Sequence, residues 1–333
     1  MIVLEFEVAD LANTRFAISP LYELVESLRL LRAPERAAAH VPWMRRALPV
    51  ARTLPLATAF ALTPRRPPVP AYYMPDFLVP PPVSPVATLP EELERLRATP
   101  EEQVRADVMR MLGSSEPPAV LAELLEDAPR ALGELADALG AYWAEVIEPE
   151  WPRIRALLDA DLAYRAQRLT TGGHASLFDD LNRLVRFCES RLELELITDA
   201  TVGLRGQGLL LVPSVFQWER PAVIYDAPWQ PTLLYPARGV ALLWEAERPQ
   251  PGAALAGVLG STRAQVLVTL DAPRTTTEVA RWLGVRASGV SAHLGALLQA
   301  GLVSRTRQGR SVLYARTELG EQLTKLEQTH QPR

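Results

Sequence analysis

Apolar and polar positions alternate at the start of the chain and then change to a helical period. Ile2, Leu4 and Phe6 share one face of a segment with period two, which predicts a β-strand. Pro20 suits the first turn of a helix, and apolar residues then recur three or four apart as far as Leu31. The chain therefore begins with a strand followed by an amphipathic helix.

The helical period also dominates residues 90–190. Apolar side chains spaced by three or four residues predict helices around these positions: Leu93 and Leu96; Val104, Val108 and Leu112; Leu121, Leu124 and Leu125; Leu132, Leu135, Leu139 and Trp143. Two further helices are expected at residues 151–169 and 176–189, with a linking loop at residues 170–174. Cys188, among apolar neighbours, is expected in the core; a redox-sensing thiol is the alternative.

Strands are expected after residue 190. Residues 191–197, 209–212 and 223–225 have strand composition, and glycines at 203, 206 and 208 mark a turn between the first two. Before them, residues 64–90 are dense in proline, which predicts a loop or extended segment. Its apolar side chains predict packing on the body of the protein, and a proline-rich recognition peptide is the alternative.

The C-terminal part contains two short helices joined by a tight turn. Thr275 stands three residues before Glu278, a capping-box arrangement that predicts a helix ending at Gly284. Val285 is expected to anchor the turn in the core. A second helix is predicted over residues 287–300, with one apolar stripe: Val290, Leu294, Leu297 and Leu298.

The opposite face of the second helix has small and polar side chains that let a helix enter a DNA major groove. Two strands around Gln308 and Gly309 are predicted to form a hairpin at residues 302–315. The arginines at the tip of this wing are expected to contact DNA phosphates or to enter the neighbouring minor groove. The predicted DNA contacts are Thr276, Thr277, Arg286, Ser288, Gly289, Ser291, Ala292, His293, Arg305, Arg307, Gln308 and Arg310.

Charge divides along the chain in the same way. The 333 residues have a net charge of −4, from 35 Lys and Arg against 39 Asp and Glu. From Leu255 to the end there are 10 basic and 5 acidic residues, which leaves 25 basic and 34 acidic residues before it. A basic module on an acidic body is typical of a protein in which only the module meets the DNA polyanion.

These patterns predict an α+β protein of two domains. We expect a mixed helical and antiparallel-sheet N-terminal domain at residues 1–250 and a winged helix-turn-helix domain at residues 251–333. The boundary is marked by Pro249, Gln250, Pro251 and Gly252. No apolar run approaches the ~20 residues of a membrane-spanning helix, so we expect no membrane partner and a cytoplasmic location.

The C-terminal part resembles the winged-helix repressors of the ArsR type, in "STRAQVLVTL" and "TTTEVARWLGVRASGVSAHLGALLQAGLVSRTRQGRSVLYA". The resemblance implies a bacterial homodimer that reads an inverted repeat in double-stranded DNA, with half-sites about one turn (~10 bp) apart, and repression relieved by a signal. The long N-terminal part is similar in arrangement to regulators that place a domain of unknown function before an ArsR-like reader.

Two departures from the ArsR pattern matter. Arg286 and Ala287 replace the Ser-Pro common at the start of the recognition helix, so Ser288 is expected to cap it instead. The cysteines and the Asp and His pairs of the family's metal sensors are absent, so neither a metal nor another cofactor is expected.

Three hypotheses remain for the N-terminal domain. The favoured one is a sensor in which aromatic residues line a pocket for a small organic effector: Trp143, Trp151, Trp218, Trp229, Trp244, Tyr225 and Tyr235. The second is a platform for oligomerisation or a protein partner, and the third is a degenerate enzyme fused to the reader. The four histidines are dispersed and no nucleophile elbow or phosphate loop is present, so we expect no enzymatic activity.

Overall fold

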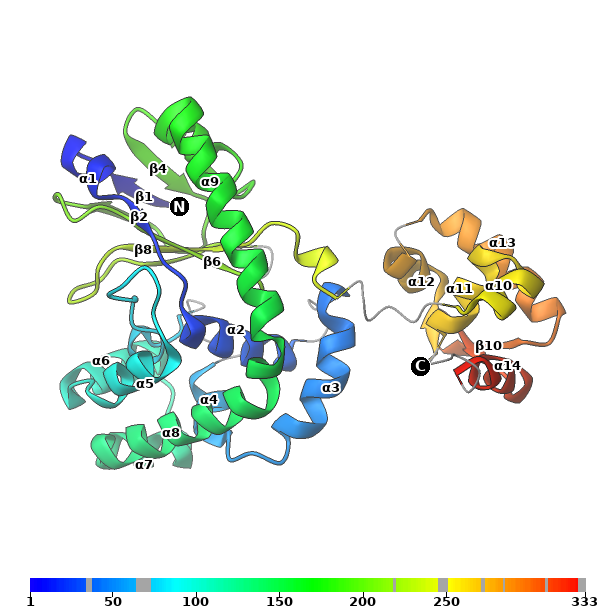
Figure 1. Cartoon of the computed structure of the whole chain (residues 1–333). Helices are drawn as coiled ribbons and strands as arrows, with labels where there is room; N and C mark the ends of the chain where they lie inside the picture. The colour runs from blue at the N-terminus through cyan, green and yellow to red at the C-terminus, as the bar shows by residue number, and fades with distance from the viewer. Residues whose placement is uncertain are drawn as a thin grey trace. The chain divides into compact units, whose positions relative to one another are not determined.

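The computed structural model describes residues 1–33, 38–63, 73–217, 220–244, 251–270, 273–283, 285–308 and 311–328. The chain divides into two compact units, Met1–Leu243 and Trp244–Arg333. Both helices and sheets are present, which confirms the α+β class (Figure 1). Each unit is described by itself below.

The first sheet of the N-terminal unit has the strand order β3-β4-β1-β5. Strand β1 (Ile2–Glu5) lies between β4 (Arg191–Leu194), with which it is antiparallel, and β5 (Ala200–Gly203), with which it is parallel. Strand β3 (Val185–Cys188) pairs antiparallel with β4. Ile2 and Leu4 are buried, so the apolar positions of the alternation that predicted β1 form the face of the strand that packs on the core.

The second sheet has the order β2-β6-β8-β7. Its members are β2 (Arg15–Phe16), β6 (Leu210–Ser214), β7 (Ala222–Ile224) and β8 (Thr232–Pro236). Strand β6 is buried along its whole length and runs parallel to both β2 and β8. The expected antiparallel sheet is therefore wrong in detail, because parallel pairs join segments far apart in sequence.

Helices cover the two sheets and form a layer of their own. The α-helices of this unit are α1 (Val8–Asn13), α2 (Pro20–Arg32), α3 (Val41–Ala51), α4 (Ala57–Leu62), α5 (Leu89–Arg97), α6 (Glu101–Leu112), α7 (Ala119–Glu126), α8 (Ala128–Tyr142) and α9 (Trp151–Asp179). Shorter helical turns are η2 (Ala38–His40), η3 (Asp76–Leu78), η4 (Trp143–Ile147), η5 (Glu148–Glu150) and η6 (Val240–Leu242). In Figure 1, α9 runs from the end near α8 past β6 to the first sheet.

The expectation for residues 170–189 is right in one part and wrong in another. Helix α9 has a kink at Gly173, with a φ of 68°, so a break between two helical parts does occur within residues 170–174, although the residues around it are helical rather than a loop. The helix then ends at Asp179, and residues expected to be helical form β3 instead. Cys188 lies on the outer side of this edge strand and is exposed rather than in the core.

The described part of the proline-rich segment packs on the body, as predicted. Phe77, Leu78 and Val79 are buried, whereas residues 64–72 lie outside the described ranges. Beside them, the hydroxyl oxygen of Tyr73 lies 3.1 Å from Oδ2 of Asp76 and 3.0 Å from Oδ1 of Asp107. The hydroxyl of Tyr73 in this segment thus lies against two buried carboxyl groups, that of Asp76 in the same segment and that of Asp107 on α6.

The C-terminal unit is a helical cluster with a small sheet. It consists of α10 (Ala253–Leu259), α11 (Ser261–Thr269), β9 (Arg274–Thr275), α12 (Thr276–Leu283), α13 (Ala287–Gln299), β10 (Val303–Gln308), β11 (Ser311–Arg316) and α14 (Glu318–Gln328). The sheet has the order β10-β11-β9. Buried residues of α10, α11, α12, α13 and the start of β10 form one hydrophobic core.

Candidate nucleic-acid interface

Helix α12 begins with the predicted capping box. The backbone N–H of Thr275 donates to Oε2 of Glu278 at 2.6 Å, and the backbone N–H of Glu278 donates to Oγ1 of Thr275 at 3.2 Å. Arg274, just before the box, places its guanidinium 4.6 Å from the ring centroid of Trp282, and its Nε donates to the carbonyl of Thr269 at 2.9 Å. Burial lowers the pKa of Arg274. These contacts fix α12 against α11.

The turn between α12 and α13 differs from the expectation in one side chain. The backbone N–H of Val285 donates to the carbonyl of Ala280 at 3.0 Å, which closes the turn. The side chain of Val285, however, is 48% exposed, so it is not the core anchor that the sequence suggested. Gly284 lies outside the described residues.

Helix α13 is held by the predicted apolar stripe. Val290, Leu294 and Leu297 are at most 1% exposed, and Leu298 is partly buried. The N-cap residue is Arg286, in extended geometry and without a side-chain capping bond. The expectation that Ser288 caps the helix is therefore wrong, because the helix already begins at Ala287.

The other side of α13 is open to solvent. The predicted contact residues exposed at its first two turns are Arg286, Ser288, Gly289, Ser291 and Ala292. His293 is half-buried at the edge of this face. A β-carbon added to Gly289 would meet no atom within 4 Å, so no close packing within the unit requires a glycine there. The front of α13 is thus a narrow, exposed surface suited to entering a groove.

The wing forms as predicted. Strands β10 and β11 pair antiparallel from Val303 opposite Arg316 to Gln308 opposite Ser311. Arg305 and Arg307 are both exposed, and their spacing of two places them on the same face of β10. Arg310 and the side chain of Gln308 lie outside the described residues. On α12, Thr277 is exposed and Thr276 is half-buried.

Two residues that the sequence did not single out hold the wing in place. Nε of Arg316 donates to the carbonyl of Leu270 at 3.0 Å, and its Nη1 donates to Oγ1 of Thr324 at 2.6 Å. Oγ1 of Thr317 donates to the carbonyl of Gly301 at 2.7 Å. The only sequence signal was an arginine directly after the predicted second strand of the wing. These bonds tie the end of β11 to α11, α13 and α14, so the wing and α13 share one rigid base.

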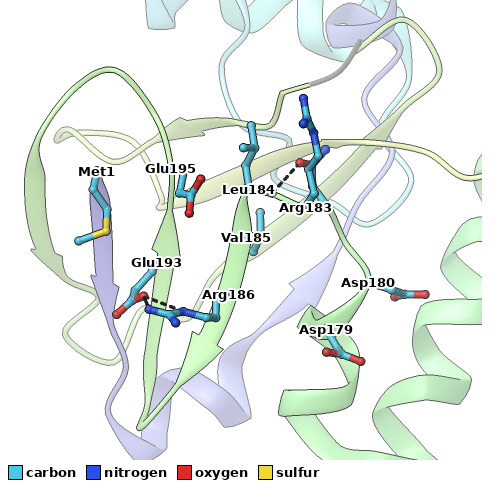
Figure 2. Close-up of a pocket in the computed structure, with 10 residues that line it drawn as sticks. Met1, Asp179, Asp180, Arg183, Leu184, Val185, Arg186, Glu193 and Glu195 are labelled. Carbon is cyan, nitrogen blue, oxygen red and sulfur yellow. Dashed lines mark hydrogen bonds and ion pairs between the residues drawn. The ribbon is translucent and has the colours of Figure 1, made fainter.

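The N-terminal unit has a cavity at one end of the first sheet (Figure 2). This cavity of about 420 Å³ lies between the end of α9 and the β3–β4 hairpin. Its walls are mainly charged: Nε of Arg186 donates to Oε2 of Glu193 at 3.0 Å, and Asp179 and Asp180 project from the end of α9. A polar, shallow site of this kind differs from the aromatic effector pocket that the sequence suggested.

The structure does not gather the predicted aromatic residues into one pocket. Trp143 and Trp151 pack on each other with ring centroids 4.9 Å apart, and Tyr235 and Trp244 are buried. The hydroxyl of Tyr235 donates to Oδ2 of Asp161 at 2.9 Å. Trp229 and Tyr225 are half-buried, and Trp218 lies outside the described residues. Tyr235 and Trp244 thus belong to the buried interior, and the other described members of the set are half-buried.

Other classes of site were sought in the described ranges of the chain. Nowhere in them do three His, Cys, Asp or Glu side chains come close enough together to hold a metal ion. None of the helices there combines the length and the apolar character needed to cross a membrane.

Comparison with known proteins gives two matches. Residues 116–241 match a family of unknown function (DUF5937), and residues 259–306 match a helix-turn-helix domain. No curated protein and no solved structure matches the chain. The second match begins before α11 and ends within β10, so it covers the capping box, the turn and α13. The C-terminal unit is thus a helix-turn-helix domain of the kind that DNA-binding regulators carry, behind a region whose family has no assigned function.

Proposed function

We propose that this protein is a transcriptional repressor of the ArsR type that binds an operator as a homodimer, with α13 in the major groove and the β10–β11 wing on the neighbouring backbone or minor groove. The observation that carries the proposal is the division of α13 into two faces. Val290, Leu294 and Leu297 of its apolar stripe are buried, and Leu298 is partly buried. After Arg286, the exposed residues at its front have short side chains or none: Ala287, Ser288, Gly289, Ser291 and Ala292.

Charge supports the same assignment. Arg305 and Arg307 project from an exposed wing. The chain from Leu255 onward has 10 basic against 5 acidic residues. Such a surface attracts the phosphates of DNA, whereas the acidic remainder of the chain repels them, so DNA is steered to the C-terminal unit.

The exposed apolar residues of α10 and α14 support a homodimer. These two helices contact each other, and Val258 on α10 and Leu319 on α14 are 83% and 51% exposed. Leu323, in contrast, packs on the core of its own unit. A second copy that covers Val258 and Leu319 removes apolar surface from water and brings two recognition helices to successive half-sites.

In this proposal the N-terminal unit is a sensor rather than an enzyme. It has a separate core of its own, and a small organic effector that binds it shifts the dimer between operator-bound and released forms. The alternative is a platform that binds another protein and no effector. A thermal-shift screen of small molecules separates the two, because only the sensor gains stability from a ligand.

The test of DNA reading uses the purified full chain to select fragments from genomic DNA, followed by titration of the selected site. Ser291→Glu places a negative charge on the exposed front of α13, and Gln299→Glu adds the same charge at the far end of that helix. We expect Ser291→Glu to weaken binding by roughly tenfold or more and Gln299→Glu to have a much smaller effect. Equal effects of the two substitutions, or no selected site, would refute the proposed interface.

A further inference from the structure

Arg286 is the one long, permanently charged side chain at the front of the recognition helix. Between Ala287 and Gln299 the sequence has no arginine, lysine or asparagine. The exposed residues that follow Arg286 are Ala287, Ser288, Gly289, Ser291 and Ala292, whose side chains are absent or short. Their side chains therefore extend less far from the helix than the guanidinium of Arg286 does.

The backbone of Arg286 is fixed, whereas its side chain is uncommitted. Its carbonyl accepts the backbone N–H of Gly289 at 3.1 Å and that of Val290 at 3.3 Å, which anchors the residue to the first turn of α13. Its φ and ψ of −72° and 139° place it just before the helix. Within the ranges that the structure describes, its guanidinium has no carboxylate partner and makes no capping bond. An exposed guanidinium on a rigid base is ready to bind a ligand outside the chain.

The small residues behind Arg286 determine how close that ligand comes. Because Gly289 and Ala292 are exposed and lack long side chains, the first turns of α13 approach the floor of a major groove closely. An arginine at such depth meets base edges rather than the phosphates at the rim. Its planar fork matches the two acceptors of guanine, O6 and N7, with two parallel hydrogen bonds.

We infer that Arg286 is the specificity-determining residue of this domain and reads one guanine in each half-site of the operator. The inference rests on the proposed function, since it requires α13 to lie in the major groove. The hydroxyl groups of Ser288 and Ser291 can form hydrogen bonds with several different bases and therefore discriminate little. Arg305 on the wing contacts phosphates and so raises affinity without base preference.

Arg286→Gln gives the sharpest test, because glutamine pairs with adenine through N6 and N7 rather than with guanine. The operator is first selected with the wild-type full chain. Affinities are then measured for every single-base-pair variant of it, for wild type, Arg286→Gln, Arg286→Ala and the wing control Arg305→Gln. Wild type is expected to lose about 10- to 100-fold at one G·C pair per half-site.

Arg286→Ala is expected to remove discrimination at that pair alone, and Arg286→Gln to favour A·T there. Arg305→Gln is expected to weaken all sequences about equally and to reduce the salt dependence by about one counterion. Uniform weakening by Arg286→Ala with a reduced salt dependence, or unchanged discrimination, would overturn the inference and leave the proposed function standing. A wild-type protein without any preferred sequence overturns both.

Discussion

Replacing Asp76 with asparagine is expected to make the N-terminal unit less sensitive to rising pH. One hydroxyl proton on Tyr73 cannot be donated to Asp76 and Asp107 at once, although both carboxyl groups lie within hydrogen-bond distance of it. Asp107 also accepts the backbone N–H of Phe77 at 3.0 Å and Nε2 of Gln103 at 2.9 Å. The second proton that the cluster needs therefore belongs to Asp76, whose carboxyl group then donates to Tyr73.

The magnitude follows from the pKa of Asp76, which burial and the neighbouring Asp107 carboxylate raise from 3.8 to about 7. The folded state keeps a proton that the unfolded chain loses above pH 4, so the unit loses stability as pH rises towards 7. The whole shift corresponds to roughly 4 kcal/mol, of which about 2.5 kcal/mol falls between pH 5 and pH 8. Asparagine donates a hydrogen bond like the protonated acid but does not titrate, so this loss disappears.

The assay is urea unfolding of the full chain at pH 5 and pH 8, followed by tryptophan fluorescence. Both proteins lose some stability between pH 5 and pH 8 for another reason, because burial also raises the pKa of Glu23 to about 8 and that of Glu92 to about 7. The expected result is a pH-dependent loss about 2.5 kcal/mol smaller in Asp76→Asn than in wild type. Glu102→Gln, at an exposed position of α6, is the control and should leave the loss unchanged. Identical losses in wild type and Asp76→Asn would refute the shared-proton arrangement.

Three further substitutions test the packing. Leu294→Ala empties a site that is 0% exposed, and should cost the C-terminal unit about 3 kcal/mol of unfolding free energy in a denaturant titration. Gly208→Ala should cost the N-terminal unit more than about 2 kcal/mol, because φ is 72° and the new β-carbon overlaps the backbone of Asn13. Gly206→Ala has a similar φ, but its new β-carbon only makes an ordinary contact with Cβ of Ala9 at 3.9 Å, so it should cost about 1 kcal/mol. Glu278→Ala removes half of the capping box and should lower unfolding free energy by about 1 kcal/mol, measured by thermal melting, while a change below 0.3 would contradict its role.

The C-terminal unit was predictable because its signals are local. The capping box spans four residues, the stripe from Val290 to Leu297 repeats at helical spacing, and the wing is a hairpin with a short turn. The errors there are single side chains. Because Val285 is apolar, its side chain was predicted to be buried. In the structure only its backbone N–H closes the turn, and the side chain is exposed.

The N-terminal unit was less predictable because its decisive pairings are distant. Strand β1 pairs with residues nearly 200 positions away, and β6 lies between two parallel partners that no local pattern reveals. The segment from residue 176 to residue 189 mixes helical spacing with the strand alternation of Val185 and Phe187. Pairing with β4 favours the strand from Val185 onward.

Buried ionisable groups were also invisible in the sequence. Helix α2 reads as amphipathic, but the fold covers it on nearly every side and buries Glu23 and Glu26. Glu23 is accommodated by backbone N–H groups of Val215 and Phe216, which follow β6 almost 200 residues later. Such partners depend on tertiary contacts that a local pattern does not contain.

The most direct test of the central claim is the ratio of the affinities of the full chain for its selected site and for a scrambled duplex of the same length and composition. Titrations of both duplexes are made at physiological salt, where phosphate attraction alone is weak. A sequence reader built from α13 and the wing predicts a ratio of at least roughly 10³. A ratio near one would contradict the account, because the C-terminal unit would then bind DNA through charge alone.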